Sequence, residues 1–272
     1  MKRSFNRKGN SSRKRERFIG EKRMRRERMD FFEIHQGLPR EGPGDNESTA
    51  FALRMLRNLP SEVRILDVGC GPGMQTIALA RQIDGKITAL DTHQPFLDVL
   101  AANAEQAGMA DKIEPINGSM FELDFPKESF DAIWSEGAIY ILGFERGLQE
   151  WREFLKPGGY VAVTELSWLR KDVPEEPRRV WAEDYPGMKG IADNIKIIEE
   201  SGYVPVGHFV LPESSWWENY YLPLLQRIGY LREKAAGDPG ALARLDESEK
   251  EIDLYRNYSD YYGYVFYMMR KV

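Results

Sequence analysis

The fold is decided by one stretch of sequence, RILDVGCGPGMQT at residues 64–76. It opens with a short apolar run, of the kind that forms a parallel strand covered on both faces, at Ile65, Leu66 and Val68. Three glycines follow, at Gly69, Gly71 and Gly73. Because glycine leaves no side chain inside a bend, backbone N–H groups and the start of the next helix can approach a ligand closely. The stretch therefore predicts a strand, a turn and a helix that hold a nucleotide-like cofactor.

The residues after the glycines separate the classes of nucleotide site. A phosphate-binding P-loop requires Gly-Lys-Ser/Thr at its end, whereas Gly73 is followed by Met74 and Gln75. A dinucleotide site favours Gly or Ala at position 74, where Met74 would obstruct the packing of helix on strand. The next strand is expected over residues 86–90 and ends on Asp91, which is placed to accept hydrogen bonds from both hydroxyls of an unphosphorylated ribose. Met74 and Gln75 therefore disfavour both a P-loop and a dinucleotide site, whereas Asp91 favours a ligand with an unphosphorylated ribose.

Four segments, in order along the chain, resemble the class I S-adenosylmethionine-dependent methyltransferases, in their small-molecule branch. DVGCGPG at 67–73 is similar to the family's first motif, and Asp91 to its ribose-binding acid. FDAIW at 130–134 is similar to the fourth strand, and LKPGG at 155–159 to the turn into the fifth strand. The resemblance runs from about residue 47 to the C-terminus. It implies an α/β fold with a seven-stranded, mostly parallel, Rossmann-like sheet, an antiparallel last strand, helices on both faces and S-adenosyl-L-methionine as the cofactor.

The resemblance also implies which residues bind that cofactor. They are Asp67, Gly69, Cys70, Gly71, Gly73, Gln75, Asp91, Thr92, Ser119, Met120 and Glu136. Relatives often carry, after the third strand, an acid that contacts the adenine amino group, and Ser119 stands at that place here. We expect the backbone N–H and thioether of Met120 to hold the ring instead. The Gly/Pro stretch at 42–44 is expected against the methionine end of the cofactor.

Two residues after the fourth strand are the candidates for catalysis, Glu136 and Tyr140. They follow strand 130–135 at the carboxyl edge of the sheet, where open α/β folds bind their ligands. Glu136 could orient an amine by charge, accept a proton or bind only the cofactor. A purely structural alternative is that Glu136 caps the helix that follows it.

Two long insertions, at about 166–190 and 212–260, interrupt the regular alternation of strands and helices. We expect them to form a helical cap over the sheet edge. The expected substrate-pocket residues are Glu165, Trp168, His208 and Trp217. Aromatic side chains there could hold a cationic amine. The alternatives are that the aromatic residues form a small core within each insertion, that His208 is structural, and that Glu165 pairs with a basic neighbour.

Composition predicts one domain over residues 30–272 that follows a basic, disordered tail at 1–29. Of 272 residues 42% are hydrophobic, enough for a full core. Residues 1–28 hold 13 Lys or Arg and three Glu, a net charge of +10. Because the net charge of the whole chain is −5, the remaining residues carry a net charge of about −15. Nucleic acid is therefore expected only through this tail, if at all. The alternatives are a solvated tail without function and a true translation start at Met24 or Met29.

The sequence offers little sign of other partners. No run approaches the ~20 apolar residues of a membrane span, and no apolar core of a signal peptide follows the basic start. The single cysteine, Cys70, forms no internal disulfide, in agreement with a cytoplasmic protein. No set of side chains has metal-binding spacing, so no metal is expected. A homodimer is compatible with the sequence.

The predicted function is methyl transfer from S-adenosylmethionine to a nitrogen or oxygen of a small molecule by direct displacement. Such chemistry requires positioning, desolvation and the removal of one proton. An RNA or ribosomal-protein methyltransferase that uses the basic tail is the alternative enzyme. A protein that binds the cofactor without catalysis is the alternative outside enzymes.

Overall fold

The computed structural model describes residues 32–272, so the expected basic tail at 1–29 and its alternatives lie outside the described residues. The described chain divides into two compact units. The larger contains residues 39–223 and 251–272, and the smaller contains residues 32–38 and 224–250. Within residues 32–272, no helix has the length and apolar character needed to cross a membrane.

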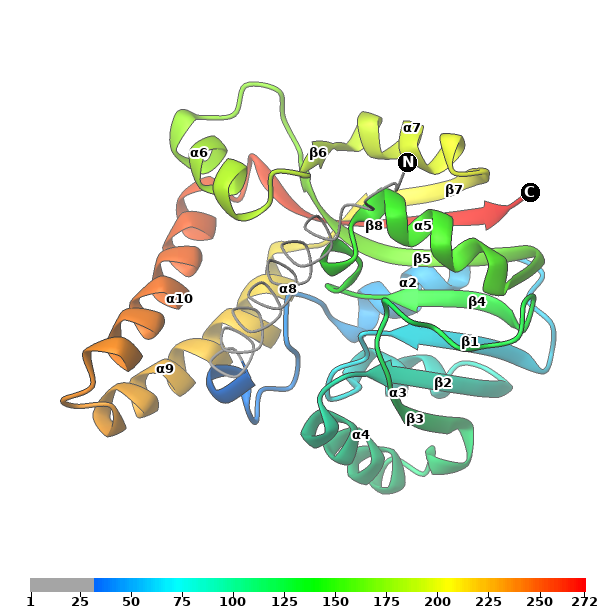
Figure 1. Ribbon diagram of the computed structural model, residues 1–272, viewed down its shortest axis with the longest axis horizontal. Coiled ribbons are helices and arrows are strands. Elements are labelled where there is room, and N and C mark those ends of the chain that lie inside the picture. The colour runs from blue at the N-terminus through cyan, green and yellow to red at the C-terminus, as the bar shows by residue number, and fades with distance from the viewer. Residues whose placement is uncertain (1–31) are drawn as a thin grey trace, which may run out of the picture. The chain divides into compact units, whose positions relative to one another are not determined.

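The larger unit is built on one sheet (Figure 1). Its strands are β1 (Val63–Val68), β2 (Gly85–Asp91), β3 (Ile113–Asn117), β4 (Phe130–Ser135), β5 (Leu155–Trp168), β6 (Lys189–Gly190), β7 (Tyr203–Val210) and β8 (Tyr262–Lys271). They lie in the order β3-β2-β1-β4-β5-β8-β7, and the short β6 pairs with β5 outside this path. Strand β8 is antiparallel to both of its neighbours, whereas the other pairings are parallel. The predicted fold class is confirmed.

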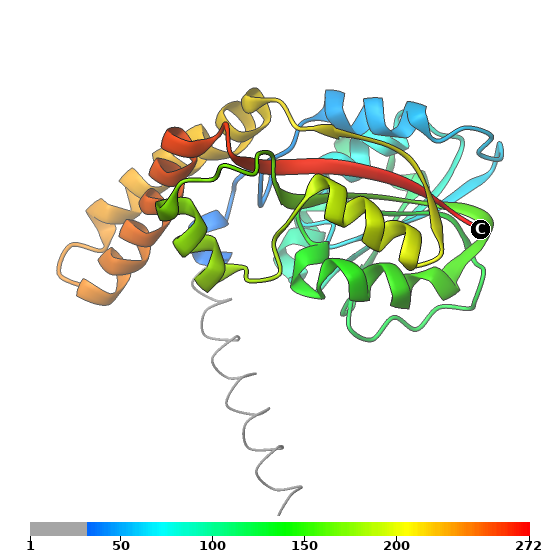
Figure 2. The same cartoon turned by 90° about the horizontal axis from the view of Figure 1, so that it is seen from above.

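Helices cover both faces of this sheet. The helices of the larger unit are α2 (Asn46–Met55), α3 (Met74–Ala80), α4 (Gln94–Gln106), α5 (Phe144–Trp151), α6 (Glu175–Asp184), α7 (Ile191–Glu200) and α8 (Glu213–Trp216), which continues into a π turn at Trp217–Tyr221. Figure 2 shows α2 on one side of the sheet and α5 and α7 on the other. The core beneath α5 and α7 contains Leu148, Trp151, Ile198, Tyr203 and Tyr267.

Local sequence explains where several elements begin and end. Helix α2 begins after Asp45, whose carboxylate accepts a hydrogen bond from the N–H of Ser48 at 2.6 Å. The sequence predicts that this helix continues to about residue 59, but α2 ends at Met55, because Leu56 is extended and Asn58 adopts a positive φ of 61°. The sequence also predicts a strand over residues 160–165, but β5 continues as far as Trp168, because its pairing with β8 extends to that residue.

The two insertions differ in how they are organised. The first contains α6 and β6 and lies wholly within the larger unit. The second contains α8, the π turn, α9 (Leu222–Lys234) and α10 (Pro239–Tyr258), and its middle part belongs to the smaller unit. There, Arg232 on α9 pairs with Asp246 and Glu249 on α10 at 2.5 and 2.6 Å. The expected cap stays a prediction for both insertions.

Candidate functional site

The glycine turn joins β1 to α3 in a conformation that only glycine adopts easily. Gly69 and Gly73 have φ values of 74° and 85°. A Cβ atom at Gly69 would lie 2.5 Å from the Cβ of Ala138, and one at Gly73 would lie 2.1 Å from Cδ1 of Leu100. Cys70 is buried in the turn, where its N–H donates to the carbonyl of Leu90 at 3.1 Å. The turn therefore packs closely against β2, α4 and the residues after β4.

Asp67 lies fully buried beneath the turn. Its Oδ2 accepts hydrogen bonds from the hydroxyl of Thr76 at 2.6 Å and from Nε2 of Gln75 at 3.4 Å. Its Oδ1 is also buried and has no hydrogen-bond partner in the part of the chain that the structure describes. Burial, followed by the charge of Glu136, raises the pKa of Asp67 to about 7. The carboxyl can therefore accept one more hydrogen bond from a ligand.

Asp91 lies at the tip of β2, as predicted. Its Oδ2 accepts a hydrogen bond from the N–H of Gly71 at 3.0 Å, and its Oδ1 accepts one from the N–H of His93 at 2.8 Å. Burial raises the pKa of Asp91, and these backbone donors oppose the rise. Each oxygen retains a lone pair for a ligand hydroxyl. The neighbouring Thr92 is exposed.

Glu41 is a third acid beside the turn. Its Cγ lies 3.3 Å from the position that a Cβ on Gly71 would take. Both carboxyl oxygens are buried, and neither has a hydrogen-bond partner among residues 32–272. Burial and then the charge of Asp91 raise the pKa of Glu41 to about 9. A buried polar group without a partner is rare and points to a ligand that supplies one.

The loop after β3 approaches the turn through Met120. This side chain is buried, and its Cε lies 3.6 Å from the position that a Cβ on Gly69 would take. The hydroxyl oxygen of Ser119 accepts a hydrogen bond from the N–H of Phe121 at 3.2 Å. Met120 thus lies beside the glycine turn, while the Ser119 side chain forms a hydrogen bond within its own loop.

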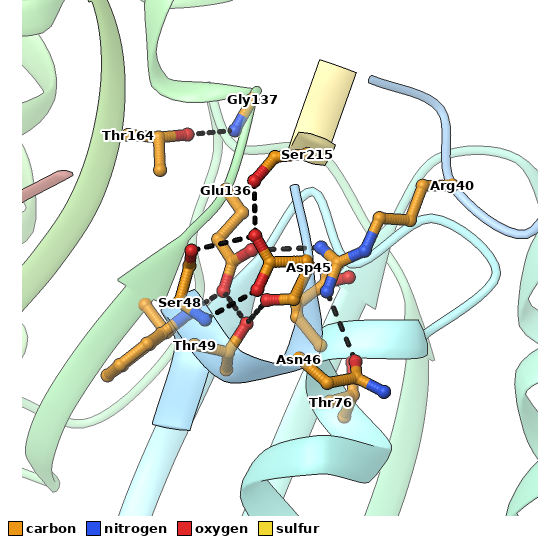
Figure 3. A network of polar contacts seen from close by, with 12 residues as sticks. Arg40, Asp45, Asn46, Ser48, Thr49, Thr76, Glu136, Gly137, Thr164 and Ser215 are labelled. Carbon is orange, nitrogen blue, oxygen red and sulfur yellow. Dashed lines mark hydrogen bonds and ion pairs between the residues drawn. The ribbon is translucent and has the colours of Figure 1, made fainter. Parts of the chain in front are cut away.

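Glu136 is held in a buried polar network at the end of β4 (Figure 3). Arg40 Nη1 pairs with its Oε2 at 2.9 Å, and the side chains of the pair are 4% and 3% exposed. The Thr49 hydroxyl and Trp134 Nε1 donate to its Oε1 at 2.7 and 2.8 Å. Glu136 therefore ties the loop before α2, and α2 itself, to β4. It does not cap the following 3₁₀ turn, whose N-cap is Ala138.

Glu165 lies on β5 with a 2% exposed side chain. The hydroxyl of Tyr185, from the first insertion, donates to its Oε1 at 2.5 Å. Its Oε2 is buried without a hydrogen-bond partner in the described chain. Burial raises the pKa of Glu165 to about 8. The ring of Tyr185 also meets that of Tyr140 edge to face at 5.9 Å, so the structure brings Glu165 and Tyr140 together.

The other expected pocket residues lie elsewhere. Trp168 contacts Tyr262 with ring centroids 6.2 Å apart. Trp217 donates a hydrogen bond to Glu213 at 3.3 Å, and Arg256 lies over its ring at 5.2 Å. His208 is exposed on β7 and stacks on Tyr267 at 6.1 Å. None of these contacts is with Glu165 itself. Their place in a pocket stays a prediction.

The comparison with known families agrees with this geometry. Residues 65–159 match a family model described as a methyltransferase domain. This match identifies residues 65–159 as part of a methyltransferase domain. The resemblance to the class I S-adenosylmethionine-dependent methyltransferases is thereby confirmed.

Curated relatives of this methyltransferase domain are fungal. A sterol 24-C-methyltransferase of Gibberella zeae is 31% identical over 140 residues, which are 50% of this chain and 36% of that protein. A sterol 24-C-methyltransferase of Neurospora crassa is 26% identical over 208 residues, which are 71% of this chain and 54% of that protein. The chain thus spans between about a third and about half of the length of these relatives.

Solved structures share the fold over most of the chain. A methyltransferase of Geobacter sulfurreducens, crystallised with S-adenosyl-L-homocysteine, has a TM-score of 0.76 and 21% identity. The match covers 90% of this chain and 98% of that one. A methyltransferase of Thiobacillus denitrificans, also with S-adenosyl-L-homocysteine, has a TM-score of 0.76 and 20% identity, and covers 89% and 98%.

Sequence reasoning missed several residues of the methyltransferase site. They are Arg40, Glu41, Thr76 and Tyr185. Thr76 could have been found, because it follows Gln75 in the first turn of α3 and faces the end of β1. Arg40, Glu41 and Tyr185 lie in loops or at a helix end, where no periodicity shows which way a side chain points.

Proposed function

We propose that this chain binds S-adenosyl-L-methionine at the glycine turn and transfers its methyl group to a nitrogen or oxygen of a small molecule. One observation carries the proposal: buried acids with unfilled hydrogen-bonding capacity surround a turn that only glycine can make. The ligand that fits must present several donors to acids. S-Adenosylmethionine has a ribose diol and an ammonium group, and its sulfonium supplies an electrophilic methyl.

The acids divide between the two ends of such a ligand. Asp91 would accept hydrogen bonds from the ribose hydroxyls with the lone pairs that Gly71 and His93 leave open. Asp67, through Oδ1, would accept one from the ammonium group. Glu41 is a further acceptor on the loop that Arg40 fixes to Glu136. Met120, beside Gly69, would pack against the adenine ring.

The nature of the acceptor rests on the relatives and the insertions. The fungal relatives are named sterol 24-C-methyltransferases, which supports a small-molecule acceptor while naming a carbon position. Tyr185, in the first insertion, donates a hydrogen bond to the buried Glu165 near the sheet edge. This carboxyl group supports an acceptor that loses a proton during the reaction. We place the reaction in the cytoplasm, on the ground that the single Cys70 forms no internal disulfide.

The first test is calorimetric titration of the full chain with S-adenosylmethionine and S-adenosylhomocysteine, with NAD as the comparison ligand. We expect binding of the first two and none of NAD. Asp91→Asn should weaken binding by roughly 10- to 100-fold, because it loses charge-assisted hydrogen bonds. The matched control is Asp98→Asn, an exposed acid on α4, which should bind normally. Binding of NAD alone, or of neither nucleoside, would overturn the proposal.

Transfer itself is tested separately. With the wild-type chain, the radiolabelled methyl group of S-adenosylmethionine should be transferred to a compound in a small-molecule extract. With Asp91→Asn, no such transfer should be seen. If the chain binds the cofactor but transfers no methyl group to any extract, it is a cofactor-binding protein and not an enzyme.

A further inference from the structure

We infer that the acceptor is an amine that enters as a cation and is held by Glu165 beside the adjoining rings of Tyr140 and Tyr185. This inference rests on the proposed function and names its substrate class.

Glu165 lies at the reacting edge of the sheet. Ser135, the last residue of β4, pairs with Val163 of β5, so Glu165 lies two residues beyond the end of β4. At this level the N–H of Gly137 donates to the hydroxyl of Thr164 at 2.7 Å, which fixes the loop after β4 against β5 (Figure 3). Residue 165 of β5 is therefore level with the loop after β4, which packs on the glycine turn through Ala138. The ring of Tyr140 in this loop contacts Tyr185, the residue that donates to the Glu165 carboxyl.

Within the described residues, the titratable groups that interact with Glu165 are tyrosines, and two of them, Tyr140 and Tyr264, also interact with the buried acid Glu251. Tyr185 donates to Glu165 directly, and Tyr140, Tyr264 and Tyr267 interact with its charge. No Lys, Arg or His within residues 32–272 forms an ion pair with it. The alternative of a basic neighbour is therefore wrong for the described chain. A buried carboxylate without a counter-charge is costly, and a cationic ligand would remove that cost.

The aromatic rings favour the same ligand. Tyr140 is 40% exposed although it contacts Tyr185, so part of its ring is open to a ligand. A cation over a tyrosine ring is attracted to the negative face of the ring, whereas a neutral hydroxyl gains no such attraction. An ammonium ion would satisfy Oε2 of Glu165 with a charge-assisted hydrogen bond and present its remaining substituents to the rings.

Glu165 can then remove the proton that blocks the reaction. The ammonium N–H bond breaks, its electron pair stays on nitrogen, and the proton moves to the carboxylate of Glu165. The nitrogen lone pair forms the new N–C bond while the C–S bond breaks and its pair passes to sulfur. The raised pKa of Glu165, about 8, supports this step, because it is closer than an ordinary carboxyl to the ~10.4 of an alkylammonium ion.

Binding of a permanent cation tests the site apart from catalysis. With the full chain saturated with S-adenosylhomocysteine, we would titrate choline and its neutral isostere 3,3-dimethylbutan-1-ol. Choline should bind and the isostere should not. Glu165→Gln should weaken choline binding by roughly 10- to 100-fold, because choline has no N–H and is attracted by the charge of the carboxylate, and should leave S-adenosylhomocysteine affinity unchanged. Glu183→Gln, an exposed glutamate on α6, is the matched control and should bind choline normally.

The pH dependence gives a readout that a structural role would not produce. Glu165 is mostly protonated at pH 7 in the empty site, so binding of a cation should release a proton. Choline affinity should therefore rise as the pH increases toward about 8 and then level off, and this rise should be absent in Glu165→Gln. Tyr185→Phe should retain the rise with weaker binding.

Substrate choice completes the test. In assays with matched amine and alcohol pairs on the same carbon skeleton, methylation should be confined to the amines. Methylation of alcohols alone, or choline binding that Glu165→Gln leaves unchanged, would overturn the amine proposal while the methyltransferase proposal stands. Failure of S-adenosylhomocysteine to bind would overturn both.

Discussion

Buried acids are the residues that distinguish the site, and they differ in whether the protein satisfies them. Glu136 is fully paired by Arg40, Thr49 and Trp134. Glu41 and Glu165 each have at least one buried carboxyl oxygen without a hydrogen-bond partner in the described chain. Because unsatisfied buried groups cost free energy, such acids are better explained by a ligand than by stability. The paired Glu136 fits a structural role, and its catalytic role stays a prediction.

The Arg40–Glu136 pair should behave as one unit in stability measurements. Arg40→Ala should lower the free energy of unfolding by about 3–5 kcal/mol, because it leaves the Glu136 charge buried and uncompensated. The double variant Arg40→Ala/Glu136→Gln should lose less than the sum of the two single variants. Urea denaturation of the four proteins measures this coupling. Additive losses would show that the two side chains act independently.

Glu41 should make stability depend on pH. Its pKa is raised from 4.5 to about 9 in the folded chain, so the folded state binds the extra proton between these values. Its contribution to stability is therefore fully present below about pH 4.5 and is lost as the pH rises toward 9. Glu41→Gln should remove this loss and be more stable than wild type at pH 9, with little difference at pH 4. Thermal denaturation across this range measures it, and Glu47→Gln, exposed on α2, is the control.

At the scale of elements, the site depends on how closely β1, α3 and the loop after β4 approach one another. Gly69→Ala would place a Cβ 2.5 Å from the Cβ of Ala138 at a φ of 74°. Gly108 has a similar φ of 68° and nothing within 4 Å of its Cβ position, so Gly108→Ala measures backbone strain alone. We expect a loss of about 1–2 kcal/mol for Gly108→Ala and about 2–5 kcal/mol for Gly69→Ala.

The two glycine variants should also differ in ligand binding. Gly69→Ala should lose affinity for S-adenosylhomocysteine, because the turn must move to accommodate the new methyl group. Gly108→Ala should bind it normally in the same calorimetric titration. Equal stability losses, or normal binding by Gly69→Ala, would mean that close approach at this turn is not what the site requires.

At the scale of the whole molecule, the basic tail decides between a small-molecule enzyme and one that acts on RNA or a ribosomal protein. Removing residues 1–28 should leave S-adenosylhomocysteine affinity and methylation of an amine unchanged. It should also leave their salt dependence unchanged, because few phosphate contacts would be lost. Activity on RNA that disappears with the tail and falls steeply with salt would favour the alternative enzyme.

The sequence by itself determined the elements whose residues are close together along the chain. The apolar run, the three glycines and Asp91 are separated by one strand and one short helix, so their spacing alone implies a strand, a turn and an acid at the next strand tip. Asp67 and Gln75 lie within the same segment, and the structure places both beneath the turn. The ends of elements are less well predicted: pairing with β8 sets the end of β5, and the extended backbone of Leu56 ends α2.

Only the tertiary structure decided which distant side chains meet. Arg40 and Glu136 are 96 residues apart, and Tyr185, in the first insertion, lies 20 residues after Glu165. Loops carry no periodic pattern that orients their side chains, so neither contact follows from spacing. The grouping of Glu165 with Trp168, Trp217 and His208 in one pocket stays a prediction. Short segments of sequence therefore determine the glycine turn and the acids near it. The burial that gives an acid its role arises only when segments that are distant in the sequence pack together.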